Sequence, residues 1–132
     1  MKKLSTIQKR ENLNDVWALD KGIGDVTQCY MIVKSNLATA DYENDQLLVD
    51  ANDCIAVLQL QNGARKDPKA IRGVTDQDLL EIVRDRLKDF QRSDMSTRET
   101  ACALTHIEEA LMWLNKRIED RIERNVLGTY EK

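Results

Sequence analysis

The sequence predicts an α+β protein in which a strand-bearing N-terminal part, residues 1–72, precedes a two-helix antiparallel hairpin, residues 73–132. Runs of β-branched and aromatic residues concentrate before residue 73, and the apolar spacing becomes helical after it. The length of 132 residues is that of about one domain. We therefore expect the two parts to fold together as one compact domain.

Two segments of the N-terminal part have the composition of strands. Residues 26–33 are rich in β-branched and aromatic side chains, and residues 54–61 are followed by an Asn-Gly dipeptide typical of tight turns. Residues 47–49 are a shorter candidate for a third strand. The first twenty residues carry one large apolar anchor, Trp17, without a clear periodicity, so we expect an arm there.

Capping motifs predict where the two helices begin. Thr75 and Asp78 have the spacing of a capping box, in which each side chain accepts a hydrogen bond from the other residue's backbone N–H, and Ser96 and Glu99 repeat the pattern. The second helix should run to about Asn125 and carries a stripe at coiled-coil spacing, formed by Leu104, Ile107, Leu111, Leu114 and Ile118. Because about five residues join the helices, they should fold back on each other.

The second predicted helix is too long for the first to cover. At 1.5 Å per residue it extends about 40 Å, against about 25 Å for the first. The far end of the stripe, with Met112 and Trp113, therefore needs another partner. A small chain with a half-covered stripe favours a homo-oligomer. The sequence leaves a dimer and a hexamer equally open.

Composition excludes several classes of function. A net charge of −3 argues against binding a nucleic acid polymer, and no apolar run approaches the length of about 18 residues that a membrane span needs. The first ten residues lack the apolar core of a secretory signal. Three widely spaced cysteines and one histidine do not make a zinc site, so we expect reduced thiols in the cytoplasm, no metal and no cofactor.

Arginines of the second helix are candidate phosphate ligands. Arg117, Arg121 and Arg124 line one helical face, and Arg121 stands where the apolar stripe should continue. Planar, always charged guanidinium groups suit phosphate oxygens. An arginine near a helix C-terminus is also favoured by the helix dipole, so spacing alone leaves both interpretations open.

Phe90, the single phenylalanine, ends the first predicted helix and is either a plug at the hairpin turn or a platform for a nucleobase. The helical carboxylates are of the type that binds Mg²⁺ in all-α nucleotide pyrophosphatases, although interspersed lysines and arginines favour a solvated surface; they are Glu81, Asp85, Glu108, Glu109, Glu119 and Asp120. The chain has no glycine-rich phosphate loop, nucleophile elbow or nucleophile–histidine–acid set. No catalytic residue is predicted, and the protein is not expected to be an enzyme.

Several segments together resemble the helical hairpin shared by phage anti-Thoeris and anti-CBASS sponge proteins. The resemblance is carried by residues 73–91 with their Phe-Gln pair, residues 97–105 with their Arg-Glu pair, the run Glu-Glu-Ala-Leu-Met-Trp-Leu at 108–114, and residues 124–129. Residues 18–20, 30–33 and 60–63 are similar to the strand-bearing part of the anti-Thoeris type. The resemblance thus covers nearly the whole chain.

This resemblance implies a phage anti-defence sponge in the host bacterial cytoplasm. Such a protein sequesters, without cleavage, the cyclic ADP-ribose isomers that TIR-domain enzymes make, and Thoeris immunity is not activated. The resemblance implies a ligand held between protomers, with these matching residues: Phe90 stacking on adenine, Thr100 at the start of the second helix, Arg117 and Arg121 on the phosphates, and Arg65 from a basic loop.

Hexameric members also hold cyclic trinucleotides at a separate site, which implies a second site here at Arg124, Gly128 and Thr129. Thr100 stands where the family often has asparagine, which leaves the preferred isomer open. Two alternatives to the sponge remain, a Mg²⁺-dependent nucleotide hydrolase that uses the helical carboxylates, and a coiled-coil adaptor without a small ligand.

Overall fold

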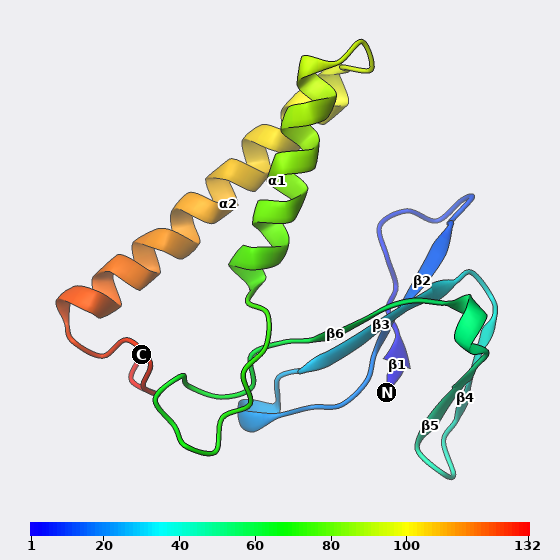
Figure 1. The fold of residues 1–132 in the computed structure, drawn as a ribbon, viewed down its shortest axis with the longest axis horizontal. Coiled ribbons are helices and arrows are strands. Elements are labelled where there is room, and N and C mark those ends of the chain that lie inside the picture. Colours follow the sequence, from blue (N-terminus) through cyan, green and yellow to red (C-terminus); the bar gives the residue numbers. More distant parts are fainter. The chain divides into compact units, whose positions relative to one another are not determined.

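The computed structural model describes all 132 residues and confirms the α+β class, with six strands followed by two helices (Figure 1). The chain forms two compact units. Residues 1–63 and 69–73 make the first unit, and residues 64–68 and 74–132 make the second. The loop 64–68 therefore belongs to the same unit as the helices, and two of its residues form hydrogen bonds with residues that follow the second helix. That the two units together form one compact domain stays a prediction.

A four-stranded antiparallel sheet, in the order β1-β2-β3-β6, is the framework of the first unit. Trp17 of β2 pairs with Met31 of β3, which pairs in turn with Val57 of β6. The two strands predicted from composition are confirmed as β3, which starts three residues later and ends one residue later than predicted, and β6, which ends two residues earlier. The strands are β1 (Lys2–Lys3), β2 (Asn14–Ala18), β3 (Cys29–Lys34) and β6 (Cys54–Gln59).

Strands β4 (Ala38–Asp41) and β5 (Gln46–Val49) form a separate two-stranded sheet. The predicted short strand at 47–49 is part of β5. At the turn between them, the Asp41 carboxylate accepts hydrogen bonds from the side-chain and backbone amides of Asn44, at 2.8 and 3.2 Å. These two bonds hold the pKa of Asp41 below its ordinary value, because they stabilise the charged form.

The core of the first unit is small. Its buried apolar side chains are Trp17, Ala18, Val33 and Leu60. The expectation of an N-terminal arm is therefore wrong for residues 14–18. These residues pair with β3 as a strand, and Trp17 and Ala18 belong to the core. These residues form a strand because they pair with a neighbouring strand, and the periodicity of a single segment does not reveal such pairing.

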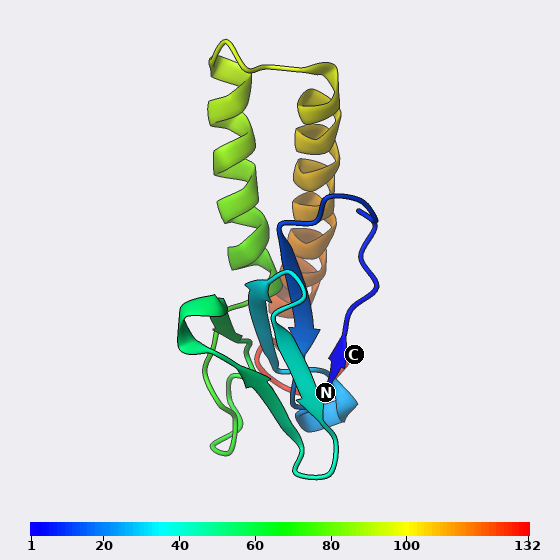
Figure 2. The same ribbon diagram turned by 90° about the vertical axis from the view of Figure 1, so that its right-hand side faces the viewer.

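An antiparallel hairpin of α1 (Asp76–Arg92) and α2 (Arg98–Glu123) makes up most of the second unit (Figure 2). The capping box of α1 is confirmed: Thr75 Oγ1 accepts from Asp78 N at 3.2 Å, and Asp78 Oδ2 accepts from Thr75 N at 2.9 Å. The box of α2 lies one residue later than predicted, with Thr97 as N-cap and Thr100 in place of Glu99.

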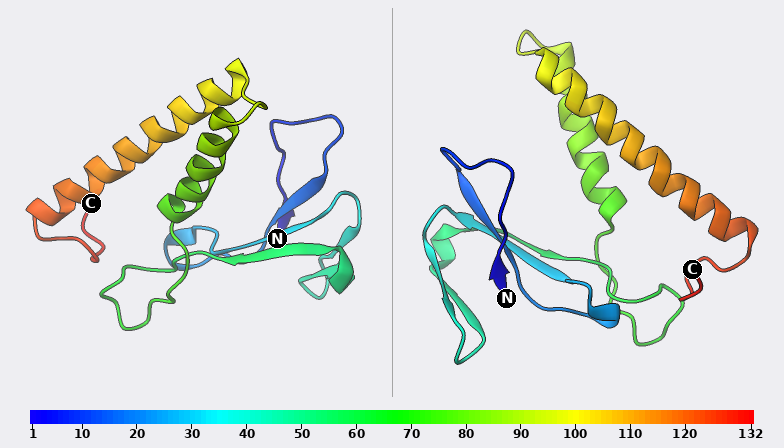
Figure 3. Two further views of the ribbon diagram at one scale, coloured as in Figure 1. Left: turned by 45° about the horizontal axis from the view of Figure 1, so that its top comes forward. Right: turned by 180° about the vertical axis from the view of Figure 1, so that it is seen from behind.

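The two helices lie closest near their connecting turn and diverge toward their other ends (Figure 3). Because α2 has 26 residues and α1 has 17, the far part of α2 extends beyond its partner. Each residue of the coiled-coil stripe is half-buried rather than buried, and Met112 and Trp113 remain 71% and 64% exposed. Neither helix has the length and apolar composition required to cross a membrane.

We expect Trp17→Ala to lower the free energy of unfolding by about 3–5 kcal/mol, because it removes the largest buried side chain of the first unit. Ile7→Ala, in the same unit but at a fully exposed position, should change it by less than about 0.5 kcal/mol. Urea denaturation followed by circular dichroism measures both. Equal losses would contradict the assignment of Trp17 to the core.

Candidate ligand-binding site

The predicted ligand residues form two groups at opposite ends of the hairpin. Phe90 and Thr100 lie on either side of the turn between α1 and α2, whereas Arg117 and Arg121 lie near the other end of α2. At 1.5 Å per residue, Thr100 and Arg117 are about 26 Å apart along the helix. The structure therefore does not bring the two groups together within one chain.

At the turn, Phe90 lines a shallow hollow of about 250 Å³, together with Arg86, Asp89, Ser93 and Met95. The Arg86 guanidinium lies 5.9 Å from the centre of the Phe90 ring, within the range of a cation–π contact. The ring is half-buried, so it is neither a sealed plug nor a free platform. Its open side gives a planar group access to an aromatic surface beside a positive charge.

Thr100 fixes the geometry of this turn. Its hydroxyl oxygen accepts from Gln91 Nε2 at 2.6 Å and from Thr97 N at 3.2 Å, and it lies 3.1 Å from Thr97 O as a donor. A hydroxyl has one donor and two acceptor positions, so these partners use its full capacity. Thr100 thus ties the start of α2 to Gln91, the residue next to Phe90, and positions the turn rather than offering a free polar group.

At the other end, Arg117 and Arg124 lie on the exposed surface of α2. Arg124 Nε donates to Asp120 Oδ2 at 3.0 Å. Arg117 has no such carboxylate partner, so its five N–H donors face water. Of the three arginines on this face, Arg117 is the one that offers an unpaired charge to a ligand.

Arg121 is 4% exposed, although it is charged. Its Nη2 donates to Thr129 O at 2.9 Å and to Val126 O at 3.2 Å, and its Nη1 donates to Glu131 O. We call residues 125–131 the C-terminal segment. This segment fills the space where the apolar stripe of α2 is interrupted. Carbonyl dipoles and the negative end of the α2 dipole stabilise the buried cation.

The C-terminal segment also holds the loop 64–68, the basic loop. Lys66 N donates to Gly128 O at 2.9 Å, and the Tyr130 hydroxyl donates to Asp67 Oδ2 at 2.8 Å. Gly128 has a φ of +81°, and a Cβ atom there would lie 2.6 Å from Cγ of Arg65. Arg65 is thus brought beside Gly128 and Thr129 of the predicted second site, and far from Phe90.

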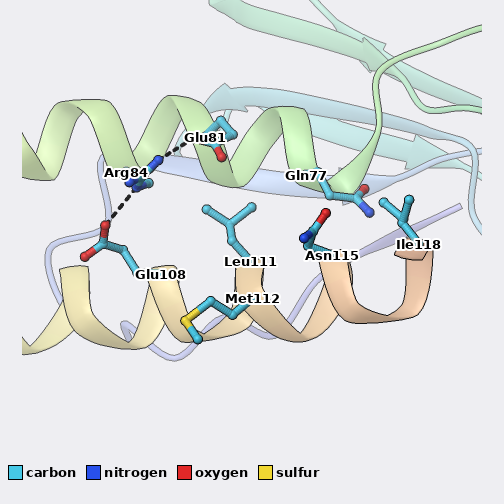
Figure 4. A pocket seen from close by; sticks show the side chains of 8 residues that line it. All are labelled: Gln77, Glu81, Arg84, Glu108, Leu111, Met112, Asn115 and Ile118. Atoms are coloured by element: carbon cyan, nitrogen blue, oxygen red, sulfur yellow. Dashed lines mark hydrogen bonds and ion pairs between the residues drawn. The ribbon is translucent and has the colours of Figure 1, made fainter. Parts of the chain in front are cut away.

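Two of the six carboxylates considered for Mg²⁺, Glu81 and Glu108, line a groove of about 610 Å³ between the diverging helices (Figure 4). Arg84 bridges it, with Nε 2.9 Å from Glu108 Oε2 and Nη1 3.3 Å from Glu81 Oε2. These hydrogen bonds raise the pKa of Arg84. The groove is lined by Gln77, Glu81, Arg84, Glu108, Leu111, Met112, Asn115 and Ile118.

Glu81 and Glu108 therefore share one cation that the chain already supplies. No group of three histidine, cysteine, aspartate or glutamate side chains is placed to hold a metal ion. His106 is exposed and lies 3.8 Å from Glu109, on the surface of α2. Burial raises the pKa of the Cys29 thiol, with a further contribution from Asp20, which makes its reactive thiolate form scarcer at neutral pH.

Comparison with known proteins identifies the class of this helical hairpin domain. Residues 57–119, just under half of the chain, match the family model described as the Acb2/Tad1 hairpin domain. Thoeris anti-defense 1 of Bacillus phage SBSphiJ7 is 53% identical over 60 residues, which cover 46% of this chain and 42% of that protein. The match thus spans less than half of the relative's length. The resemblance to phage anti-Thoeris proteins is confirmed.

We expect Thr100→Val to lower the free energy of unfolding by about 1–2 kcal/mol, because it removes the hydroxyl that completes the cap and holds Gln91. Thr105→Val is the matched control, because the Thr105 hydroxyl donates only to Ala101 O of its own helix. Its loss should stay below about 0.5 kcal/mol in the same urea denaturation. Similar losses for both variants would exclude a special role for Thr100.

Proposed function

We propose that this protein is a phage anti-defence sponge. It binds cyclic ADP-ribose isomers made by bacterial TIR-domain enzymes, in the cytoplasm of the host, and withholds them from the Thoeris effector without cleaving them. The relative named for Thoeris anti-defence supports the biological role. The observation that carries the chemical part is the pair of half-sites, with an accessible aromatic ring at one end of the hairpin and unpaired Arg117 at the other.

A cyclic ADP-ribose isomer contains one group for each half-site. Its adenine is a planar base that can stack on Phe90, a contact of about 1–3 kcal/mol. Its two phosphates accept charge-assisted hydrogen bonds from arginine, of about 1.5–3 kcal/mol each. A few such terms in a preformed pocket reach the roughly −12 kcal/mol of a nanomolar complex, which tight sequestration needs.

The two half-sites belong to two protomers in this proposal. Phe90 and Arg117 lie too far apart in one chain to meet across a ligand in which base and phosphates are joined through one ribose. Antiparallel pairing of two hairpins places the turn of each beside the far end of the other's α2. The exposed Met112 and Trp113 and the half-covered stripe supply apolar surface for this pairing.

A hexamer built from such dimers is compatible with the second proposed site, for cyclic trinucleotides. Arg124, Gly128 and Thr129 lie near the end of α2, and Gly128 contacts the stem of Arg65. In this proposal, Arg65 therefore serves the second site more directly than the first. Thr100 acts through the turn that it fixes, whereas Arg121 holds the C-terminal segment in the arrangement seen here and is reached by a phosphate only if that segment moves.

The experiment that tests sequestration uses release of the intact ligand. Purified protein is mixed with a panel of cyclic ADP-ribose isomers, recovered by gel filtration and denatured by heat, and the released compound is identified by mass spectrometry. An intact isomer is the expected result. A hydrolysed product would show an enzyme instead, and retention of nothing would favour the adaptor.

We expect Phe90→Ala to weaken ligand binding by about 10- to 100-fold, the equivalent of one lost stacking contact, as measured by titration calorimetry. Phe90→Leu keeps an apolar side chain at the turn but lacks the aromatic face, so it should lose nearly as much. Arg10→Ala, an exposed arginine of the first unit, is the control and should bind like the wild type. Wild-type affinity in Phe90→Leu would exclude stacking.

Complementation tests whether two protomers share a site. Phe90→Ala and Arg117→Ala proteins should each bind poorly, but after mixing and exchange of protomers a heterodimer has one intact site. Random pairing in a two-fold symmetric dimer restores about a quarter of the wild-type capacity. No recovery in a mixture shown to exchange would contradict the shared site.

A further inference from the structure

Backbone carbonyl oxygens of three residues in the C-terminal segment accept hydrogen bonds from the guanidinium group of Arg121. We propose that this segment is a strap that phosphate-bearing ligands displace, so that opening of the strap exposes Arg121 and frees the basic loop. The proposal rests on the proposed function only for the identity of the natural ligand. The strap itself is a property of the second unit.

Several hydrogen bonds close the strap. Besides the bonds from Arg121, Val126 N donates to Arg121 O at 2.9 Å, and the hydroxyl of Thr129 donates to Val126 O at 2.5 Å. Val126 and Leu127 are half-buried, and Tyr130 is 58% exposed. Water can replace the polar contacts of such a segment, so it opens at a low free-energy cost relative to global unfolding.

Phosphate competes well for the same donors. Carbonyl oxygens offer Arg121 only partial negative charge, whereas a phosphate or pyrophosphate offers a full charge in the planar, forked geometry that guanidinium favours. Each carbonyl released in the exchange is near the surface and can bind water. The net replacement of neutral acceptors by a charged one therefore favours the open strap when phosphate is present.

Opening is coupled to the basic loop through two contacts. Lys66 N donates to Gly128 O, and Tyr130 donates to Asp67, so a displaced segment also releases the loop that carries Arg65 and Lys66. Arg121, Arg65 and Lys66 then become available at the same time. A ligand that binds the open form better shifts the population toward it.

Hydrogen exchange of single backbone amides, measured by NMR with inorganic pyrophosphate as the probe, tests the strap. The amides of Val126, Thr129 and Lys66 each donate to the strap or to its anchor. Their exchange should accelerate, with saturation, as pyrophosphate is added at constant ionic strength. The amide of Leu60, which donates to Gln28 O in the first unit, is the internal control and should not respond. Unchanged or slower exchange at the three amides would overturn the proposal.

Two variants separate the strap from a general effect of anions. Tyr130→Phe removes the anchor to Asp67 and should accelerate exchange at the strap amides about fivefold without pyrophosphate, the factor expected for one ordinary hydrogen bond. Tyr42→Phe, at an exposed tyrosine of the first unit, is the matched control. Arg121→Gln should hold the strap open and abolish the response to pyrophosphate. Lys116→Gln should keep the strap closed and still respond to pyrophosphate. If Arg121→Gln does not fold, Tyr130→Phe still decides the outcome.

The proposal of the strap and the proposed sponge function can be contradicted independently. If pyrophosphate accelerates exchange but the wild-type protein retains no cyclic ADP-ribose isomer, the strap stands and the proposed function falls. If an isomer is retained and the three amides do not respond to pyrophosphate, the sponge stands and the strap is wrong.

Discussion

The second unit depends on one buried cation. Arg121 is its only buried residue, and the bonds from its guanidinium to the C-terminal segment take the place of an apolar core at this end of the hairpin. A buried charge is costly unless its hydrogen bonds are satisfied, so the path of residues 125–131 follows from the donors of Arg121. The basic loop then follows from that path, because Lys66 and Asp67 bond to it.

Local signals predicted those parts of the fold that local interactions determine. The first capping box, the helix lengths and the two apolar strands could be predicted because each depends on residues close in sequence. Strand β2 could not, since its order comes from pairing with β3. The N-cap of α2 is Thr97 rather than Ser96, with Thr100 rather than Glu99 as its partner. Gln91, on the other helix, donates to the Thr100 hydroxyl, a tertiary contact that capping rules do not contain.

The candidate site shows the same division. The spacing of the three arginines correctly placed Arg117 and Arg121 on α2 and Arg124 at its C-cap end, but it gave no indication that one would be buried, one paired and one unpaired. Those differences come from Asp120 and from carbonyl groups of the backbone, which have no side-chain signature. Gln91 and Tyr130 were missed for the same reason, although the Phe-Gln pair beside the turn was a signal that pointed to Gln91.

If the proposed ligand site is divided between two protomers, the separation of Phe90 from Arg117 along the hairpin makes ligand binding depend on pairing. A site divided between protomers exists only in the paired state, so an isolated chain has no capacity to hold a ligand. Below the concentration at which the chains pair, capacity rises with the square of the protein concentration rather than in proportion to it. Sequestration of this kind has a threshold in expression level that depends on the strength of the contact between hairpins as well as on affinity for the signal, because a ligand that binds only the pair also favours pairing.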